Sequence, residues 1–140
     1  MNDPIDDRLL GCVASIAMQA GNRMKGDHGF TTSCKCSKDD LVTSADLANE
    51  IFLKEELLAL LPGSSFKGEE GNDIPVSPEG YTWIVDPIDG TTNFARGIPM
   101  STVSIGLMRD AVPYLGVVYN PYTEEMFYAM DGRGAWCNGQ

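Results

Sequence analysis

The sequence lacks any long hydrophobic run and any excess of basic residues. No segment approaches the roughly 20 apolar residues that a helix needs to span a bilayer. The opening MNDPIDDRLL is acidic where a secretion signal is basic and then apolar. Lysine and arginine number 10 against 20 acidic residues, for a formal net charge of -10. We therefore expect a cytoplasmic protein that binds neither nucleic acid nor an anionic membrane surface.

Histidine and suitably spaced cysteines are also scarce. The chain has one histidine, His28, and four cysteines, of which Cys34 and Cys36 form a C-x-C pair but no two form C-x-x-C. A zinc site needs more ligands at better spacing. The cysteines are explained by reduced structural thiols, with a redox-sensitive or metal-binding C-x-C as the alternative.

Two helices are predicted in the first half of the chain. With 140 residues, 43% of them hydrophobic, the sequence has the proportions of one globular domain. Apolar residues recur at helical spacing over residues 4–24, where Asp3 can act as the N-cap. A second helix can begin at Thr43 or Ser44 and is expected to stop at Pro62. The segment between them, FTTSCKCSKDD, is typical of a loop or hairpin.

The second half of the chain changes to strand periodicity. Short apolar or alternating runs are separated by Gly, Asp, Asn and Pro. We expect a strand leading into a turn within 64–71, and further strands within 81–86, 101–110, 111–121, 124–130 and 134–139. Two helices followed by mainly antiparallel strands predict a layered α+β fold in which helices cover the sheet.

Carboxylates gather at the ends of two predicted strands. In WIVDPIDGTTNF, Asp86 and Asp89 bracket Pro87, whose ring restricts the backbone, so both carboxylates can point to one side of a turn. A second pair, Glu69 and Glu70, lies in GEEG. Oxygen ligands of this kind suit a hard cation such as Mg²⁺ or Mn²⁺.

An anion site is predicted beside these carboxylates. Gly90 permits close approach of the backbone, and Thr91 and Thr92 can open a helix or tight turn whose N–H groups face an anion. Bound cations, helped by a lysine such as Lys35 or Lys38, would supply the positive field that the acidic chain lacks. Carboxylates next to an anion cradle are typical of phosphoryl transfer.

Each of these features alone has a simpler interpretation. Aspartates at strand ends commonly bond to nearby backbone N–H groups, GEEG is an ordinary solvated turn, and Lys35 alone is a surface charge. Thr91 and Thr92 could merely cap a helix. The residue pattern by itself leaves these alternatives open.

Three main motifs, which follow one another along the chain in the family's order, and one further segment resemble those of one enzyme family. WIVDPIDGTTNF resembles the first signature of the inositol monophosphatase family, the lithium-sensitive, metal-dependent phosphatases. DLVTSAD resembles the family's segment before its second helix, GEE its metal-ligand turn, and GAWCNG one of its strands. The resemblance implies a layered helix and sheet sandwich of the sugar-phosphatase type.

The resemblance also implies that residues 1–140 are the N-terminal part of a longer domain whose C-terminal α/β half is missing. Family members are roughly twice this length, within the usual single-domain range. Their second signature, WD-x-AA, which supplies another aspartate to the second metal, is absent here. We therefore expect 140 residues alone to have little or no activity.

The metal ligands are carried over from the family residue by residue. The resemblance makes Glu69, Asp86 and the backbone carbonyl of Ile88 ligands of a first metal, and Asp86 and Asp89 ligands of a second. It implies two or three Mg²⁺ ions, with Mn²⁺ as a substitute. Glu70 is expected to have a supporting role.

The resemblance assigns the remaining residues to water activation and phosphate binding. Thr91, supported by Asp46, would help Glu69 to position and activate the attacking water. The phosphate would be held by the amides of Gly90 and Thr91, together with the groups Asp89, Thr92 and Lys35.

The implied activity is hydrolysis of a small phosphate monoester, with inositol 1-phosphate as the expected substrate and a homodimer as the expected full-length form. Fructose-1,6-bisphosphatase or another sugar or nucleotide phosphatase is the alternative enzyme. A non-catalytic fragment that binds metal or a partner chain is the alternative outside enzymes.

Overall fold

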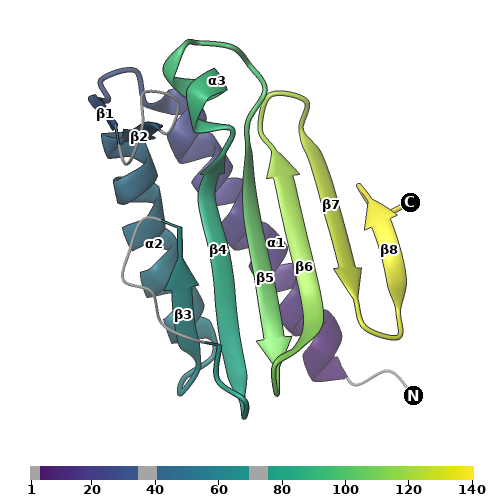
Figure 1. The fold of residues 1–140 in the computed structure, drawn as a ribbon. Coiled ribbons are helices and arrows are strands. Elements are labelled where there is room, and N and C mark those ends of the chain that lie inside the picture. Colours follow the sequence, from purple (N-terminus) through teal and green to yellow (C-terminus); the bar gives the residue numbers. More distant parts are fainter. Residues whose placement is uncertain (1–3, 35–40, 70–75) are drawn as a thin grey trace.

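A computed structural model gives the fold of residues 4–34, 41–69 and 76–140 (Figure 1). Two long helices, α1 (Pro4–Gly26) and α2 (Ser44–Leu60), come first, and a short third helix, α3 (Thr91–Ala95), lies between strands. The strands are β1 (Thr32–Cys34), β2 (Leu41–Thr43), β3 (Ser65–Gly68), β4 (Tyr81–Asp89), β5 (Thr102–Arg109), β6 (Val112–Asn120), β7 (Glu125–Met130) and β8 (Gly134–Cys137).

The strands form two sheets. β1 and β2 make a separate antiparallel pair, while the other six strands form one sheet in the order β3-β4-β5-β6-β7-β8. β3 runs parallel to β4, and every later neighbour pair is antiparallel. The ends of β3 and β4, and α3, therefore lie toward the same end of the sheet, at the top of Figure 1.

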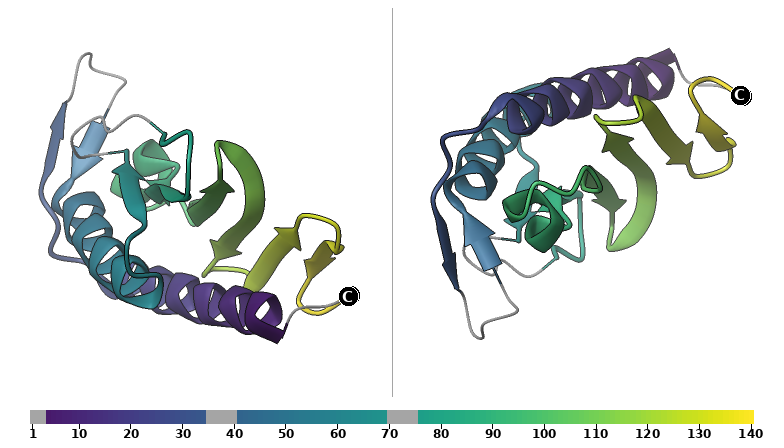
Figure 2. Two further views of the ribbon diagram at one scale, coloured as in Figure 1. Left: turned by 90° about the horizontal axis from the view of Figure 1, so that it is seen from below. Right: turned by 90° about the horizontal axis from the view of Figure 1, so that it is seen from above.

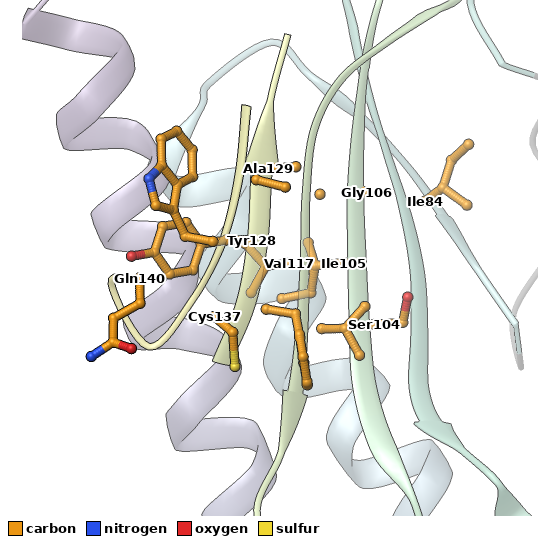
Figure 3. Close-up of a pocket in the computed structure, with 14 residues that line it drawn as sticks. Ile84, Ser104, Ile105, Gly106, Val117, Tyr128, Ala129, Cys137 and Gln140 are labelled. Carbon is orange, nitrogen blue, oxygen red and sulfur yellow. The ribbon is translucent and has the colours of Figure 1, made fainter. Parts of the chain in front are cut away.

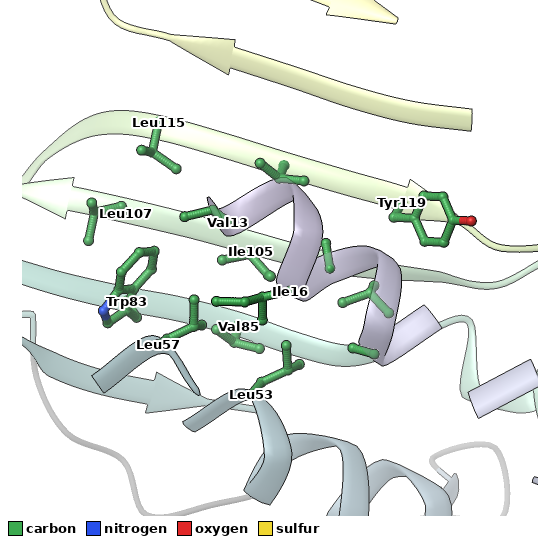
Figure 4. Packing of buried hydrophobic residues seen from close by; sticks show 14 of the residues in the cluster. Val13, Ile16, Leu53, Leu57, Trp83, Val85, Ile105, Leu107, Leu115 and Tyr119 are labelled. Carbon is green, nitrogen blue, oxygen red and sulfur yellow. The ribbon is translucent and has the colours of Figure 1, made fainter. Parts of the chain in front are cut away.

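Both long helices pack on one face of the large sheet (Figure 2). α1 contacts β5, β6 and β7, and α2 contacts β3 and β4. Figure 4 shows Val13 and Ile16 of α1 and Leu53 and Leu57 of α2 against the strands, and Trp83 of β4, labelled in the same view, is fully buried. Burial of this apolar layer, about 25 cal/mol per Å², is the main stabilisation of the fold.

The start of α2 is fixed by a capping box. The Thr43 side chain accepts a hydrogen bond from the Asp46 amide, and the Asp46 carboxylate accepts one from the Thr43 amide. The helix ends with Leu61 as C-cap, directly before Pro62 and Gly63, which cannot easily continue a helix. The sequence predicted either Thr43 or Ser44 as the N-cap, and the structure shows that it is Thr43.

The predicted α+β fold is confirmed, with helices over a mainly antiparallel sheet. One strand boundary was wrong, since the strand expected over 81–86 continues through Pro87 to Asp89. The expected cap Asp3 lies outside the described residues. Within the described part of the chain, no helix is both long enough and apolar enough to cross a membrane.

The opposite face of the sheet is left uncovered by the described residues. The register aligns Ile84, Gly106, Gly116, Ala129 and Ala135 in one row across five strands. These residues also line a shallow apolar hollow of about 680 Å³ on this face (Figure 3). No Asp or Glu side chain lines the hollow, although Ser104, the β5 partner of Asp86, does.

Candidate active site

A bulge at the end of β4 puts Asp86 and Asp89 on the same face of the sheet. Asp86 pairs with Ser104 and Asp89 pairs with Thr102, so three steps along β4 match two along β5. Ser104 and Thr102 share a face because strand side chains alternate, and their partners share it too. In a regular strand, residues three apart would point to opposite faces. The inserted residue therefore brings the two carboxylates to one side.

Glu69 reaches the same place from the neighbouring strand. Its amide donates to the Val85 carbonyl at 3.1 Å, which extends the parallel pairing of β3 and β4 by one residue. The side chain of Glu69 is exposed and that of Asp86 half-buried. Burial, the largest cause, and the negative charges of Glu69, Asp89 and Asp46 raise the pKa of Asp86 from 3.8 to about 7, although the backbone hydrogen bond with Ile88 opposes this.

The chemistry at Asp86 suits a cation. Its Oδ1 atom is buried without a hydrogen-bond partner among the described residues, which is costly for a carboxylate oxygen. Within the same residues, no three His, Cys, Asp or Glu side chains form a complete metal-binding group. The predicted first set contains two carboxylates and a backbone carbonyl, that of Ile88, so it does not depend on a third side chain. An oxygen-only set of this kind fits Mg²⁺ or Mn²⁺.

Thr91 and Asp46 form a hydrogen-bonded pair beside the bulge. The Thr91 hydroxyl lies 2.8 Å from Asp46 Oδ1 and 3.0 Å from the Ile88 carbonyl oxygen, and it can donate to either. Asp46 is fully buried. Its other oxygen, Oδ2, accepts from the amide and the hydroxyl of Thr43. The capping box of α2 therefore fixes the carboxylate of Asp46, which in turn accepts a hydrogen bond from Thr91.

Gly90 turns the chain from β4 into α3. It acts as N-cap with φ 97°, a conformation that side chains rarely adopt, and an added Cβ would lie 3.0 Å from the Met100 carbonyl oxygen. Thr91 and Thr92 form the first turn of α3, as the sequence suggested. The first amides of a helix have no acceptor within it.

The structure brings together most of the predicted site residues. The charges of Glu69, Asp89 and Asp46 each act on Asp86, and Ile88, Gly90, Thr91 and Thr92 lie next to Asp89 in the chain. Lys35, Glu70, Lys38 and Cys36 lie outside the described residues. Of the other cysteines, Cys12 and Cys137 are free thiols.

Sequence reasoning missed Asn49, which is buried on α2 and donates from its side-chain amide to the Pro87 carbonyl at 2.9 Å. A polar residue on the buried side of an amphipathic helix, one turn after Asp46, was the only available signal.

Comparison with known proteins identifies the family. A family model described as "Inositol monophosphatase family" matches residues 9–140. The chain belongs to the inositol monophosphatase family. Its similarity to Inositol monophosphatase 1 of Solanum lycopersicum is 40% identity over 139 residues, which cover 96% of this chain and 50% of the tomato protein. The resemblance inferred from the three motifs is thereby confirmed.

Solved structures of the family share the fold. The extragenic suppressor protein suhB from Bartonella henselae superposes with a TM-score of 0.88 at 35% identity, covering 95% of this chain and 53% of that one. Staphylococcal IMPase-I, solved with its products, gives 0.85 at 26% identity, covering 96% and 51%. The chain thus spans about half the length of the curated inositol monophosphatase that it matches.

Proposed function

We propose that this chain contributes the first metal site and the water-positioning residues of a metal-dependent phosphate-monoester hydrolase. The observation that carries the proposal is the bulge in β4, which turns Asp86 and Asp89 to one face, where the charge of Glu69 acts on Asp86. Glu69, Asp86 and the carbonyl of Ile88 would hold one Mg²⁺, and Asp86 with Asp89 would hold another.

The chain's own residues then position the reactants. When bound, the cations would supply positive charge that polarises a water molecule and offsets charge on the phosphate oxygens. When the Thr91 hydroxyl donates a hydrogen bond to Asp46, the Thr91 oxygen can accept a hydrogen bond from that water. Asp46 cannot turn away because Thr43 holds its second oxygen. Glu69 would accept the other proton of the water.

The phosphate would bind where β4 turns into α3. The amides of Gly90 and Thr91, with Thr92, provide donors at the start of that helix, and Asp89 lies next to them. Lys35 would add positive charge. We propose inositol 1-phosphate as the substrate and the cytoplasm as the location, with a homodimer as the full-length form, in keeping with the family.

The metal site can be tested on the 140-residue chain by isothermal titration with Mn²⁺ at pH 7.5. We expect Asp86→Asn to weaken binding by about tenfold or more, because it removes the carboxylate shared by both sites. Glu56→Gln is the matched control, since it also removes one negative charge. Glu56 is exposed and lies about 15 Å from Asp46 along the axis of α2. Equal Mn²⁺ affinity in the wild type and Asp86→Asn would refute the assignment.

The substrate needs a separate measurement on a protein of full family length that carries this N-terminal half. Phosphate release from inositol 1-phosphate, fructose 1,6-bisphosphate and adenosine 3′,5′-bisphosphate should be compared in the presence of Mg²⁺. We expect inositol 1-phosphate to have the highest kcat/KM. A preference for the second or third compound would favour the sugar or nucleotide phosphatase alternative. No turnover of any of them, with Mn²⁺ still bound, would favour the non-catalytic alternative.

A further inference from the structure

The β4 bulge carries both aspartates of the proposed site, yet its own backbone has lost regular pairing. The β4–β5 register shifts between Asp86 and Asp89, so neither Pro87 nor Ile88 has a partner of its own in the ladder. Both residues are buried. A buried carbonyl without a donor is unfavourable, and the bulge therefore needs hydrogen-bond donors from outside the sheet.

Two side chains provide these donors. Asn49 Nδ2 donates to the Pro87 carbonyl at 2.9 Å, a contact between residues 38 positions apart. Thr91 Oγ1 lies 3.0 Å from the Ile88 carbonyl. Asn49 therefore holds one carbonyl of the bulge, and the single proton of the Thr91 hydroxyl can be donated either to the other carbonyl or to Asp46.

Among the described residues, the Pro87 carbonyl is the hydrogen-bond partner of the Asn49 side chain. Its side chain is 2% exposed, and Oδ1 is buried without a hydrogen-bond partner among the residues that the structure describes. An apolar residue would avoid that unsatisfied oxygen. The amide therefore bears a desolvation cost, which the bond to Pro87 offsets within the described part of the chain.

Asn49 also lies one turn after Asp46 on α2, on the same side of the helix. Asp46 accepts from Thr91 just after the bulge, while Asn49 donates to Pro87 within it. One rigid helix thus contacts the segment from Pro87 to Thr91 at two points. This spacing fixes where the bulge lies relative to α2.

We propose that Asn49 is a positioning residue, which holds the Pro87 carbonyl and so fixes the bulge that turns Asp86 and Asp89 to one face. The expected effect of Asn49 on cation affinity rests on the metal site of the proposed function. Its expected effect on the conformation of the bulge does not. Asn49 acts through the bulge and touches neither cation nor substrate.

The test uses Asn49→Leu, which keeps a branched side chain with the same number of heavy atoms and removes the donor, and Asn49→Ala as a second variant in case the first does not fold. Amide resonances of Ile88, Asp89 and Gly90 in ¹H–¹⁵N spectra report the bulge, and Mn²⁺ titration reports the site. We expect those resonances to shift in the metal-free protein and Mn²⁺ affinity to fall about tenfold.

Ile16→Val is the control for lost stability, because Ile16 lies on the buried side of α1 and belongs to the core. It should leave both the bulge resonances and the Mn²⁺ affinity unchanged. Unshifted resonances in the Asn49 variants would overturn the positioning role. Shifted resonances with unchanged affinity would overturn its link to the cation site. If the wild type binds no Mn²⁺, the proposed function fails, while the resonances still decide the role of Asn49.

Discussion

Asp86 is the side chain of the site whose ionisation is made unfavourable by its surroundings. Its pKa is raised because the carboxylate is partly buried and faces Glu69, Asp89 and Asp46. A raised pKa means that the folded protein binds this proton more tightly than the unfolded chain does. In the absence of a cation, the contribution of Asp86 to stability is therefore lost as the pH rises from about 4 to about 7.

This predicts a pH-dependent effect of Asp86→Asn on folding. In EDTA, the variant should gain stability relative to the wild type as the pH rises from 5 to 8, because the wild-type carboxylate ionises over this range and the amide does not. Urea unfolding followed by circular dichroism at both pH values measures the difference. A constant difference between the two proteins would contradict the raised pKa, and Glu56→Gln serves as the control for charge.

At the scale of elements, the contact of α1 with the sheet depends on a glycine. A Cβ added to Gly21 would lie 2.5 Å from Cδ2 of Tyr119 and 3.3 Å from Pro121, so the helix backbone rests directly on the end of β6. Gly11 lies in the same helix, and an added Cβ would meet nothing within 4 Å. Substitutions at the two glycines can therefore distinguish the effect of packing against the sheet from the effect of helix propensity.

We predict opposite effects for the two substitutions. Gly21→Ala should reduce the free energy of unfolding by about 1–3 kcal/mol, since the methyl group overpacks the contact with Tyr119. Gly11→Ala should increase it by about 0.5–1 kcal/mol, because alanine favours a helix over glycine. Urea denaturation measures both. A gain in stability from Gly21→Ala would show that α1 does not lie this close to β6.

The elements themselves were largely predictable from sequence, because their signals are local. Apolar spacing located both helices, and Thr43 was recognised as a possible cap. The bulge was not predictable, since its extra residue is defined by the register against β5, a non-local pairing. Asp86 and Asp89 were expected to share a side through a turn, and they do so within a strand.

The partner of a buried polar group was also hidden from sequence. Nothing near Asn49 in the chain indicates that its amide meets a carbonyl 38 positions away. The parallel pairing of β3 with β4 was likewise beyond local patterns, although it places Glu69 beside Asp86. The roles given to the site residues come from the family resemblance and stay predictions.

At the scale of the whole molecule, the sheet is covered on one face only by the residues that the structure describes. Phe127 on the uncovered face is 44% exposed, whereas Leu107 on the helix-covered face is fully buried. Ile84, which lines the hollow, is also exposed. The two faces should therefore respond differently to substitution.

We predict that Phe127→Lys changes the free energy of unfolding of the 140-residue chain by less than about 1 kcal/mol, while Leu107→Ala reduces it by about 2–5 kcal/mol. The lysine should also reduce self-association at high protein concentration, measured by analytical ultracentrifugation, because it charges an apolar surface. A loss from Phe127→Lys as large as that from Leu107→Ala would show that this face is covered in solution.

The small residues of the row on that face, Gly106, Gly116, Ala129 and Ala135, have a consequence for mutational tolerance. An added Cβ at Gly106 or Gly116 would meet only ordinary contacts, the nearest at 3.6 Å and 4.0 Å, so the 140-residue chain has room for larger side chains there. A second layer of protein lying on the row would instead rest directly on the main chain. A substitution scan of this chain would then score these glycines as dispensable, and the same scan of a longer protein with such a layer would score them as essential.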